Sequence, residues 1–263
     1  MDYIVLYQAI TTIMFLLMYS GASFYQMSVI FMISVLFYVM FKNWQNRPKI
    51  IFVEGNIGSG KTTWLNKIEE KGIKVVREPV NAWQKTGILQ EFYDNMKRWS
   101  LTFQYHAFNT RLQTVKNLYS SHHKYIFVER SPDCDKNVFA KNLYEQGKMT
   151  EMEWKMYNEW FNYTQEVYDD ANYPVIPDGY IYLRTFPSIA HERIKKRARS
   201  EEDTIPEKYL EDIHTLHERW LRYYQQPYVN APVLVIDCNK DFENDNLRFN
   251  EIVREVKTFL KEI

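Results

Sequence analysis

Residues 55–63 read Gly-Asn-Ile-Gly-Ser-Gly-Lys-Thr-Thr and follow the apolar run Ile50–Glu54 directly. They match G-x-x-x-x-G-K-[ST], a pattern in which backbone N–H groups wrap a phosphate between a strand and a helix. Glycines tolerate the backbone angles of such a loop, and a helix beginning near Lys61 would direct its positive end at the same anion. Lys61 would bridge the β- and γ-phosphates, and Thr62 would bind Mg²⁺. The predicted nucleoside triphosphate site comprises Gly55, Asn56, Ile57, Gly58, Ser59, Gly60, Lys61, Thr62 and Thr63.

Short apolar runs alternate with long helical patterns around this loop. The predicted strands are Ile50–Glu54, Lys74–Arg77, Tyr125–Glu129, Tyr180–Leu183 and Val233–Asp237. Most lack polar alternation, which is typical of strands that are buried on both faces. The predicted helices are Lys61–Glu70, Gly87–Ser120, Lys136–Asn172, Pro187–Arg199 and Pro206–Gln225. Strands that alternate with helices indicate an α/β fold with a parallel sheet.

The charges balance over the whole chain. The 263 residues include 33 basic and 33 acidic side chains, so the net charge is zero. A neutral chain gives no electrostatic reason to bind nucleic acid, and we expect no such partner. Cys134 and Cys238 are too few for a disulfide scaffold and fit a reducing compartment. The histidines show no zinc pattern, because His214 and His217 could share a helix face but lack an evident third ligand.

The N-terminal residues 1–49 form a hydrophobic leader ahead of the domain 50–263, and Tyr3–Phe41 contains no Asp, Glu, Lys, Arg or His. A membrane span needs about 20 apolar residues, and the leader offers Tyr3–Tyr19 and Phe24–Phe41 as candidates. Two short spans could form a helical hairpin, or Phe24–Phe41 could span alone. We therefore expect one or two hydrophobic helices and a membrane anchor through residues 3–41. The alternatives are a hairpin that packs on the protein and a leader absent from the mature protein.

Three basic residues of the leader, Lys42, Arg47 and Lys49, follow the uncharged run Tyr3–Phe41 at once. By the positive-inside rule they favour a membrane-associated protein whose main domain faces the cytosol or the mitochondrial matrix. If the leader is absent from the mature protein, the expected location is the cytoplasm. Secretory and mitochondrial targeting peptides fit poorly, because the leader has no basic first region and no arginine before Arg47.

Five blocks of residues, in order along the chain, carry a family resemblance. They are Gly55–Thr63, Glu78-Pro79-Val80 with Trp83, Phe103-Gln104, Glu129-Arg130-Ser131 and Arg193–Glu202. Together they resemble the deoxynucleoside kinase family, in its deoxycytidine and deoxyguanosine kinase branch. The resemblance implies a P-loop kinase fold, with a five-stranded parallel sheet flanked by helices, and a homodimer. It also implies Mg²⁺-dependent transfer of the γ-phosphoryl group of ATP to the 5′-hydroxyl of a deoxynucleoside.

The resemblance also implies catalytic roles for Glu78, Arg130 and Lys61. Glu78 matches the family's general base, and Arg130 would hold both Glu78 and the path of the phosphoryl group. Glu129 would bind Mg²⁺ through water, beside the direct ligand Thr62. These groups position the hydroxyl and neutralise the charge of the transferred phosphoryl group, which is the work that this chemistry requires.

Further residues would bind the two substrates. Arg193 and Arg197 are four residues apart and share one helix face, which suits a lid over phosphates. By resemblance, Arg197 and Arg199 contact the phosphates of the donor, and Glu202 holds the sugar 3′-hydroxyl together with Tyr93. A carboxylate acceptor and a phenol donor suit such a hydroxyl.

Gln104, Ala107 and Arg111 share one face of a predicted helix and form the candidate base pocket. Gln104 presents a donor and an acceptor side by side, so it can read the edge of a base. The aromatic residues that would stack on the base or enclose it are Trp83, Phe103 and Phe139. Arg111 needs a partner on its mostly apolar face, and Asp135 is the expected one. By resemblance, Ala107, Arg111 and Asp135 favour purine deoxynucleosides or deoxycytidine over thymidine.

Two other functions stay open. A nucleoside monophosphate kinase would need extra basic groups on the acceptor side, where this chain offers Gln104 and aromatic residues. A catalytically silent, membrane-bound assembly subunit would typically lack the loop lysine or the base, whereas this chain keeps Lys61 and Glu78.

The chain also departs from the family at Cys134 and Lys136, where serine and arginine are common. Lysine cannot reproduce a planar arginine contact.

Overall fold

The computed structural model describes residues 12, 23–45, 47–116, 118, 121–170, 177–199, 205–223, 229 and 231–263. The chain divides into two units, Met1–Arg47 and Pro48–Ile263. The first unit contains helix α2 (Phe24–Gln45), which extends the predicted helix Phe24–Phe41 by four residues. Apart from Thr12, the other candidate segment, Tyr3–Tyr19, lies outside the described residues.

Within the described residues, no helix is both long enough and apolar enough to cross a bilayer. The predicted membrane anchor, and the orientation that depended on it, therefore have no support from these residues. Gln26, Ser28 and Ser34 interrupt the apolar sequence of α2, and the helix continues through Lys42. The hydroxyl groups of Ser28 and Ser34 donate to backbone carbonyls of the same helix, at 2.8 and 2.9 Å.

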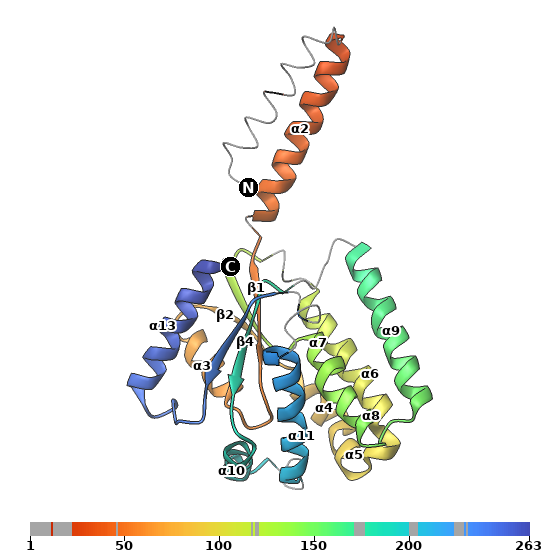
Figure 1. The fold of residues 1–263 in the computed structure, drawn as a ribbon, viewed down its shortest axis with the longest axis vertical. Helices are drawn as coiled ribbons and strands as arrows, with labels where there is room; N and C mark the ends of the chain where they lie inside the picture. The colour runs from red at the N-terminus through yellow and green to blue at the C-terminus, as the bar shows by residue number, and fades with distance from the viewer. Residues whose placement is uncertain are drawn as a thin grey trace. The chain divides into compact units, whose positions relative to one another are not determined.

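The second unit is built around a parallel sheet, which confirms the predicted α/β fold (Figure 1). Its strands are β1 (Lys49–Glu54), β2 (Lys74–Val76), β3 (Tyr125–Glu129), β4 (Gly179–Arg184) and β5 (Val233–Asp237). The spatial order is β2-β3-β1-β4-β5, so β1 is central and pairs with both β3 and β4. Since all strands run in the same direction, their carboxyl ends meet at one edge, where the phosphate loop leaves β1.

Helices cover both faces of the sheet (Figure 1). The side chains of β1 alternate between these two layers. Ile51 and Val53 pack with α3 (Lys61–Glu69) and α13 (Asn246–Glu262), whereas Ile50 and Phe52 face the larger layer. Both faces are fully buried, which explains why the strand sequence lacks polar alternation. Helix α13 was not among the predicted helices, although its buried residues form one apolar stripe: Phe249, Ile252, Val256, Phe259 and Leu260.

The larger layer contains the segments predicted as the long helices Gly87–Ser120, Lys136–Asn172 and Pro206–Gln225, together with the short helices Val80–Lys85 and Pro132–Cys134, which were not predicted. Its elements are α4 (Val80–Lys85), α5 (Ile88–Asp94), α6 (Met96–Val115), α7 (Pro132–Cys134), η2 (Asp135–Ala140), α8 (Lys141–Glu145), α9 (Glu151–Asp170), α11 (Glu207–His217) and η4 (Glu218–Tyr223). Helix α10 (Pro187–Arg197) follows β4. The predicted helix Gly87–Ser120 is broken at Asn95, whose side chain accepts from the N–H of Arg98 and caps α6. A turn at Gly147, with φ of 66°, separates α8 from α9.

Candidate active site

The loop between β1 and α3 has the backbone that the sequence predicted. Gly58 has φ of 77°, and a Cβ atom there would collide with the carbonyl oxygen of Ala190 in α10, so only glycine fits. Lys61 begins α3, and its Nζ donates to the carbonyl oxygens of Gly55 and Asn56 at 3.0 and 2.8 Å. Burial, assisted by the positive charge of Arg130, lowers the pKa of Lys61 to about 7. A phosphate beside Lys61 would favour its charged form again.

Two carboxylates lie beside this loop, at the carboxyl ends of β2 and β3. Glu129 accepts a hydrogen bond of 2.8 Å from the Thr62 hydroxyl and one of 3.4 Å from the backbone N–H of Glu78. Thr62 and Glu129 therefore present adjacent oxygen atoms, which are the ligands that Mg²⁺ prefers. The donor set fits the predicted metal ion.

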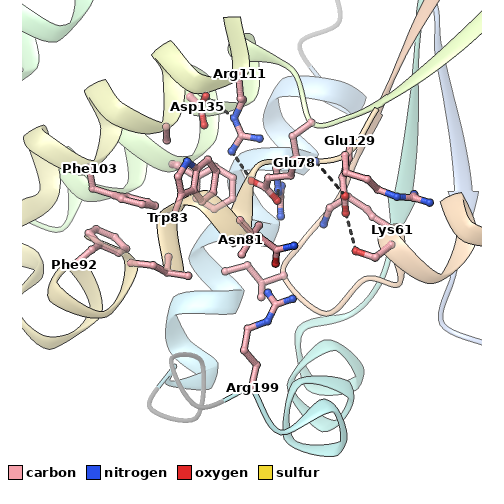
Figure 2. Close-up of a pocket in the computed structure, with 18 of the residues that line it drawn as sticks. Lys61, Glu78, Asn81, Trp83, Phe92, Phe103, Arg111, Glu129, Asp135 and Arg199 are labelled. Atoms are coloured by element: carbon pink, nitrogen blue, oxygen red, sulfur yellow. Dashed lines mark hydrogen bonds and ion pairs between the residues drawn. The ribbon is translucent and has the colours of Figure 1, made fainter. Parts of the chain in front are cut away.

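Glu78 contacts two buried arginines, Arg111 (Figure 2) and Arg130. Its Oε1 is 2.5 Å from Nη2 of Arg111, and its Oε2 is 3.5 Å from Nε of Arg130. Nε of Arg111 also contacts Oδ2 of Asp135 at 2.7 Å, so the predicted ion pair is present. Burial raises the pKa of Glu78, but Arg111 and Arg130 lower it by more, to about 2. For Asp135 burial outweighs the attraction of Arg111 and raises the pKa to about 6.

Arg130 has an uncommon backbone conformation. Its φ of 62° lies in the left-handed region, which is costly for a residue other than glycine and is found most often at functional sites. The backbone N–H of Arg130 donates to the carbonyl oxygen of Val53 at 3.1 Å. Its guanidinium lies 4.7 Å from the centre of the Phe139 ring. The side chain thereby lines the same cavity as Glu78.

A cavity of about 310 Å³ extends from the phosphate loop to an aromatic wall (Figure 2). Trp83, Phe92 and Phe103 come from three successive helices, with ring centres 5.5 Å apart for Trp83 and Phe103 and 4.5 Å apart for Phe92 and Phe103. Gln104 and Arg111 line the cavity, and both are buried. Oε1 of Gln104 and Nη1 of Arg111 lack hydrogen-bond partners among the described residues. A buried acceptor and a buried donor without partners point to a ligand that supplies the complementary groups.

Comparison with known proteins supports the family resemblance that the sequence motifs indicated. A family model described as deoxynucleoside kinase matches residues 51–261. The chain belongs to the deoxynucleoside kinase family. A probable deoxycytidine kinase of Fowlpox virus is 37% identical over 215 residues, which cover 82% of this chain and 89% of the relative. Deoxycytidine kinase 2 of Gallus gallus is 35% identical and mitochondrial deoxyguanosine kinase of Xenopus laevis 34%, each covering 83% of this chain and 92% of the relative.

In this deoxynucleoside kinase most of the predicted side chains line the one cavity. They are Ile57, Gly58, Lys61, Thr62, Glu78, Trp83, Tyr93, Phe103, Gln104, Ala107, Arg111, Glu129, Arg130, Asp135, Phe139, Arg197 and Arg199. Gly60, Thr63 and Arg193 instead line a neighbouring cavity of about 450 Å³, which shares Gly58 and Arg197 with the first. Asn56 supports the loop from behind, because its Nδ2 donates to the carbonyl oxygen of Leu210. Glu202 lies outside the described residues.

Six cavity residues of the kinase were not predicted: Arg77, Val80, Asn81, Leu89, Phe92 and Tyr209. Leu89 and Phe92 are three apart on α5, so helical spacing would have placed both on the face toward Phe103. Tyr209 comes from α11 and reaches the cavity through the packing of distant segments. No local pattern around Tyr209 indicates this position.

Proposed function

We propose that this chain transfers the γ-phosphoryl group of ATP to the 5′-hydroxyl of a deoxynucleoside, and that it prefers deoxycytidine or a purine deoxynucleoside to thymidine. One observation carries the proposal: a single cavity joins the phosphate loop to a buried, incompletely paired Gln104 and Arg111. The relatives named deoxycytidine kinase and deoxyguanosine kinase support deoxynucleoside kinase activity.

Glu78 would hold the 5′-hydroxyl in line with the phosphorus atom. With its pKa at about 2, Glu78 is ionised at neutral pH and is a weak base. We therefore expect it to orient the hydroxyl first and to accept the proton late, when bond formation to phosphorus has made that proton acidic. Arg130 contacts Glu78 and would balance negative charge near the transferred group.

The donor triphosphate would lie over the loop, with its phosphates between Lys61 and the arginines of α10. The neighbouring cavity carries Arg193, Lys196 and Arg197 and suits the rest of the donor nucleotide. When bound by Thr62 and Glu129, Mg²⁺ would neutralise charge on the β- and γ-phosphates. On this arrangement the acceptor and the donor enter from opposite sides of Lys61.

We expect the full-length protein, given labelled ATP, to convert deoxycytidine or a purine deoxynucleoside into its 5′-monophosphate. Replacing Lys61 with alanine should lower kcat by about 10²–10³, since this removes a preorganised positive charge at the phosphates. Lys71→Ala is the matched control, because Lys71 is exposed in the turn that follows α3 and lies outside the cavity. The four deoxynucleosides and thymidylate are compared as acceptors by product analysis.

Three other outcomes of that assay would contradict the proposal, and two of them would identify a competing function. Transfer to thymidylate, with no transfer to deoxynucleosides, would indicate a nucleoside monophosphate kinase. A folded wild type that transfers to neither class would indicate the catalytically silent subunit. Activity that Lys61→Ala leaves unchanged would place the catalytic centre elsewhere.

We also propose a homodimer formed through α9. Four apolar side chains of this helix are exposed, namely Met152, Met156, Tyr163 and Val167. Their spacing places them on one face of the helix, where a second copy would cover them. This proposal fits the larger helical layer, to which α9 contributes its opposite face through Tyr157 and Phe161.

The full-length protein is expected to have the mass of a dimer in light scattering, and Met156→Glu should shift it to a monomer, because a charge would be buried in an apolar interface. Asn162→Glu on the same helix is the control, since Asn162 lies off the apolar stripe and contacts Lys136 at 3.0 Å. A monomeric wild type would contradict this interface, as would a dimer that Met156→Glu leaves intact.

A further inference from the structure

A second cluster of chemically active side chains lies next to the catalytic residues. Glu54 ends β1, Cys134 ends α7 and His217 ends α11, and the side chains of all three are fully buried. The carboxylate oxygen, the thiol sulfur and the imidazole nitrogen lie within 4.8 Å of one another. Cys134 Sγ is 3.7 Å from Nε2 of His217. The fold thus gathers three different kinds of metal ligand at one point.

The separation of the sulfur and nitrogen atoms in this cluster matches a zinc site. Tetrahedral Zn²⁺, with a Zn–S bond of about 2.3 Å and a Zn–N bond of about 2.0 Å, holds sulfur and nitrogen roughly 3.5 Å apart. Nδ1 of His217 is 2.8 Å from the carbonyl oxygen of Ile213, which leaves the lone pair of Nε2 directed at the cluster. Oε1 of Glu54 accepts from the N–H of Ser131 at 2.7 Å, while its Oε2 has no hydrogen-bond partner among the described residues.

We propose that Glu54, Cys134 and His217 bind one Zn²⁺ ion, at a site distinct from the Mg²⁺ site of Thr62 and Glu129. A thiolate with an imidazole selects zinc over magnesium, because Mg²⁺ prefers oxygen ligands alone. The ion would connect β1, α7 and α11, three elements from distant parts of the sequence whose ligand residues lie near Arg130. The site goes beyond the proposed function, since phosphoryl transfer does not require it.

Binding at this site exchanges a proton for the metal ion. Burial raises the pKa of the Cys134 thiol, while burial and the charge of Arg130 lower the pKa of His217, so the metal-free protein holds a thiol and a neutral imidazole. The thiol loses its proton to solvent as the sulfur–metal bond forms, and the nitrogen and carboxylate donate lone pairs. Zn²⁺, one thiolate and one carboxylate sum to zero charge. Arg130, whose Nη1 is 3.7 Å from Cys134 Sγ, then faces no net repulsion.

The experiment uses full-length protein made metal-free and then given Co²⁺, which replaces zinc and absorbs light, either after folding or during refolding. We expect one Co²⁺ per chain, with a sulfur-to-cobalt charge-transfer band and the visible bands of tetrahedral cobalt. Zn²⁺ should displace the Co²⁺, raise Tm by several degrees and release about one proton per ion near neutral pH. Metal is added in both ways because entry into a buried site of the folded protein can be slow. A negative result after refolding with the metal then cannot be caused by slow entry.

Two variants make the test specific to this cluster. Cys134→Ser should abolish the charge-transfer band and the rise in Tm, whereas Cys238→Ser, at the other free buried cysteine, should keep both. If Cys134→Ser fails to fold by circular dichroism, Glu54→Gln replaces it and should weaken Co²⁺ binding at least tenfold. The proposal is overturned if refolding with Co²⁺ yields no thiolate band, or if the cysteine or glutamate variant binds as the wild type does. Neither result bears on phosphoryl transfer.

Discussion

Replacing Glu78 with glutamine is expected to lower kcat by about 10²–10⁴, the range for loss of a positioned general base, with little change in the KM for ATP. Glutamine keeps the size of the side chain but cannot accept the proton of the 5′-hydroxyl. It also removes the charge that balances Arg111 at 2.5 Å and Arg130 at 3.5 Å. Steady-state kinetics with a saturating deoxynucleoside measure the effect.

Glu70→Gln is the control, because Glu70 is an exposed carboxylate at the end of α3. Its kcat should equal that of the wild type. A Glu78→Gln variant whose kcat falls less than tenfold would refute the role of Glu78 as the base. The comparison also separates loss of the base from a general loss of negative charge.

The pKa of Glu78 adds a dependence on pH. Because this pKa falls from 4.5 in the unfolded chain to about 2 in the folded protein, the ionised side chain stabilises the fold above pH 4.5. That contribution is lost as the pH falls from 4.5 toward 2. Acid titrations followed by circular dichroism compare the stability of the two proteins. The Glu78→Gln variant should be less stable than the wild type above pH 4.5, and this difference should disappear as the pH falls toward 2.

Replacing Arg111 with methionine together with Asp135 with alanine is expected to lower the preference for deoxycytidine over thymidine by about 10³ in kcat/KM. The two residues form a buried ion pair of 2.7 Å in the wall of the cavity, beside Gln104. Removing both avoids a buried arginine with too few partners and opens space for the thymine methyl group. Competition between the two deoxynucleosides with labelled ATP measures the ratio directly.

The matched control is Lys208→Met with Asp212→Ala, an ion pair of 2.8 Å whose lysine is exposed on α11. Its substrate preference should not change, because exposed ion pairs contribute little. A wild type that already prefers thymidine would contradict the proposal, and so would a double variant with an unchanged ratio.

The raised pKa of Asp135 predicts how specificity varies with pH. Since this pKa is about 6, the carboxylate is protonated as the pH falls through 6 and loses its charge toward Arg111. The KM of the wild type for deoxycytidine should therefore rise below about pH 6. The double variant lacks Asp135, so its KM should not show this increase.

Much of the architecture could be predicted from local patterns. The apolar runs around Phe52, Phe127 and Ile181 indicate strands, because a strand buried on both faces needs no polar alternation. Gly58 and Lys61 indicate the phosphate loop, since the chemistry of that loop lies within nine consecutive residues. The breaks at Asn95 and Gly147 were missed, because helical spacing continues on both sides of each.

The same local reasoning was insufficient for the leader and for α13. An uncharged run predicted a membrane anchor, which the described part of the chain does not support. Helix α13 packs, together with α3, on one face of the sheet through a stripe that includes Phe249, Val256 and Phe259. Charged residues separate the apolar residues of α13 in the sequence, so the amphipathic pattern was missed. The pattern becomes clear once the buried face of the helix is known.

The sequence by itself determined the parallel α/β fold, the phosphate loop and the identity of most cavity residues, because these depend on patterns within short segments and on family motifs. The sequence also predicted that Arg111 pairs with Asp135 and Arg130 with Glu78, whereas only the tertiary structure showed that Arg111 contacts Glu78 as well. The packing of helices α6, α7 and α11 against the sheet brings Glu78 to Arg111 and Arg130, and brings Glu54 to Cys134 and His217. Burial raises the pKa of both Glu78 and Asp135, but Arg111 and Arg130 lower that of Glu78 by more, so the two pKa values shift in opposite directions. Desolvation and ion pairing both depend on neighbours that are distant in the sequence.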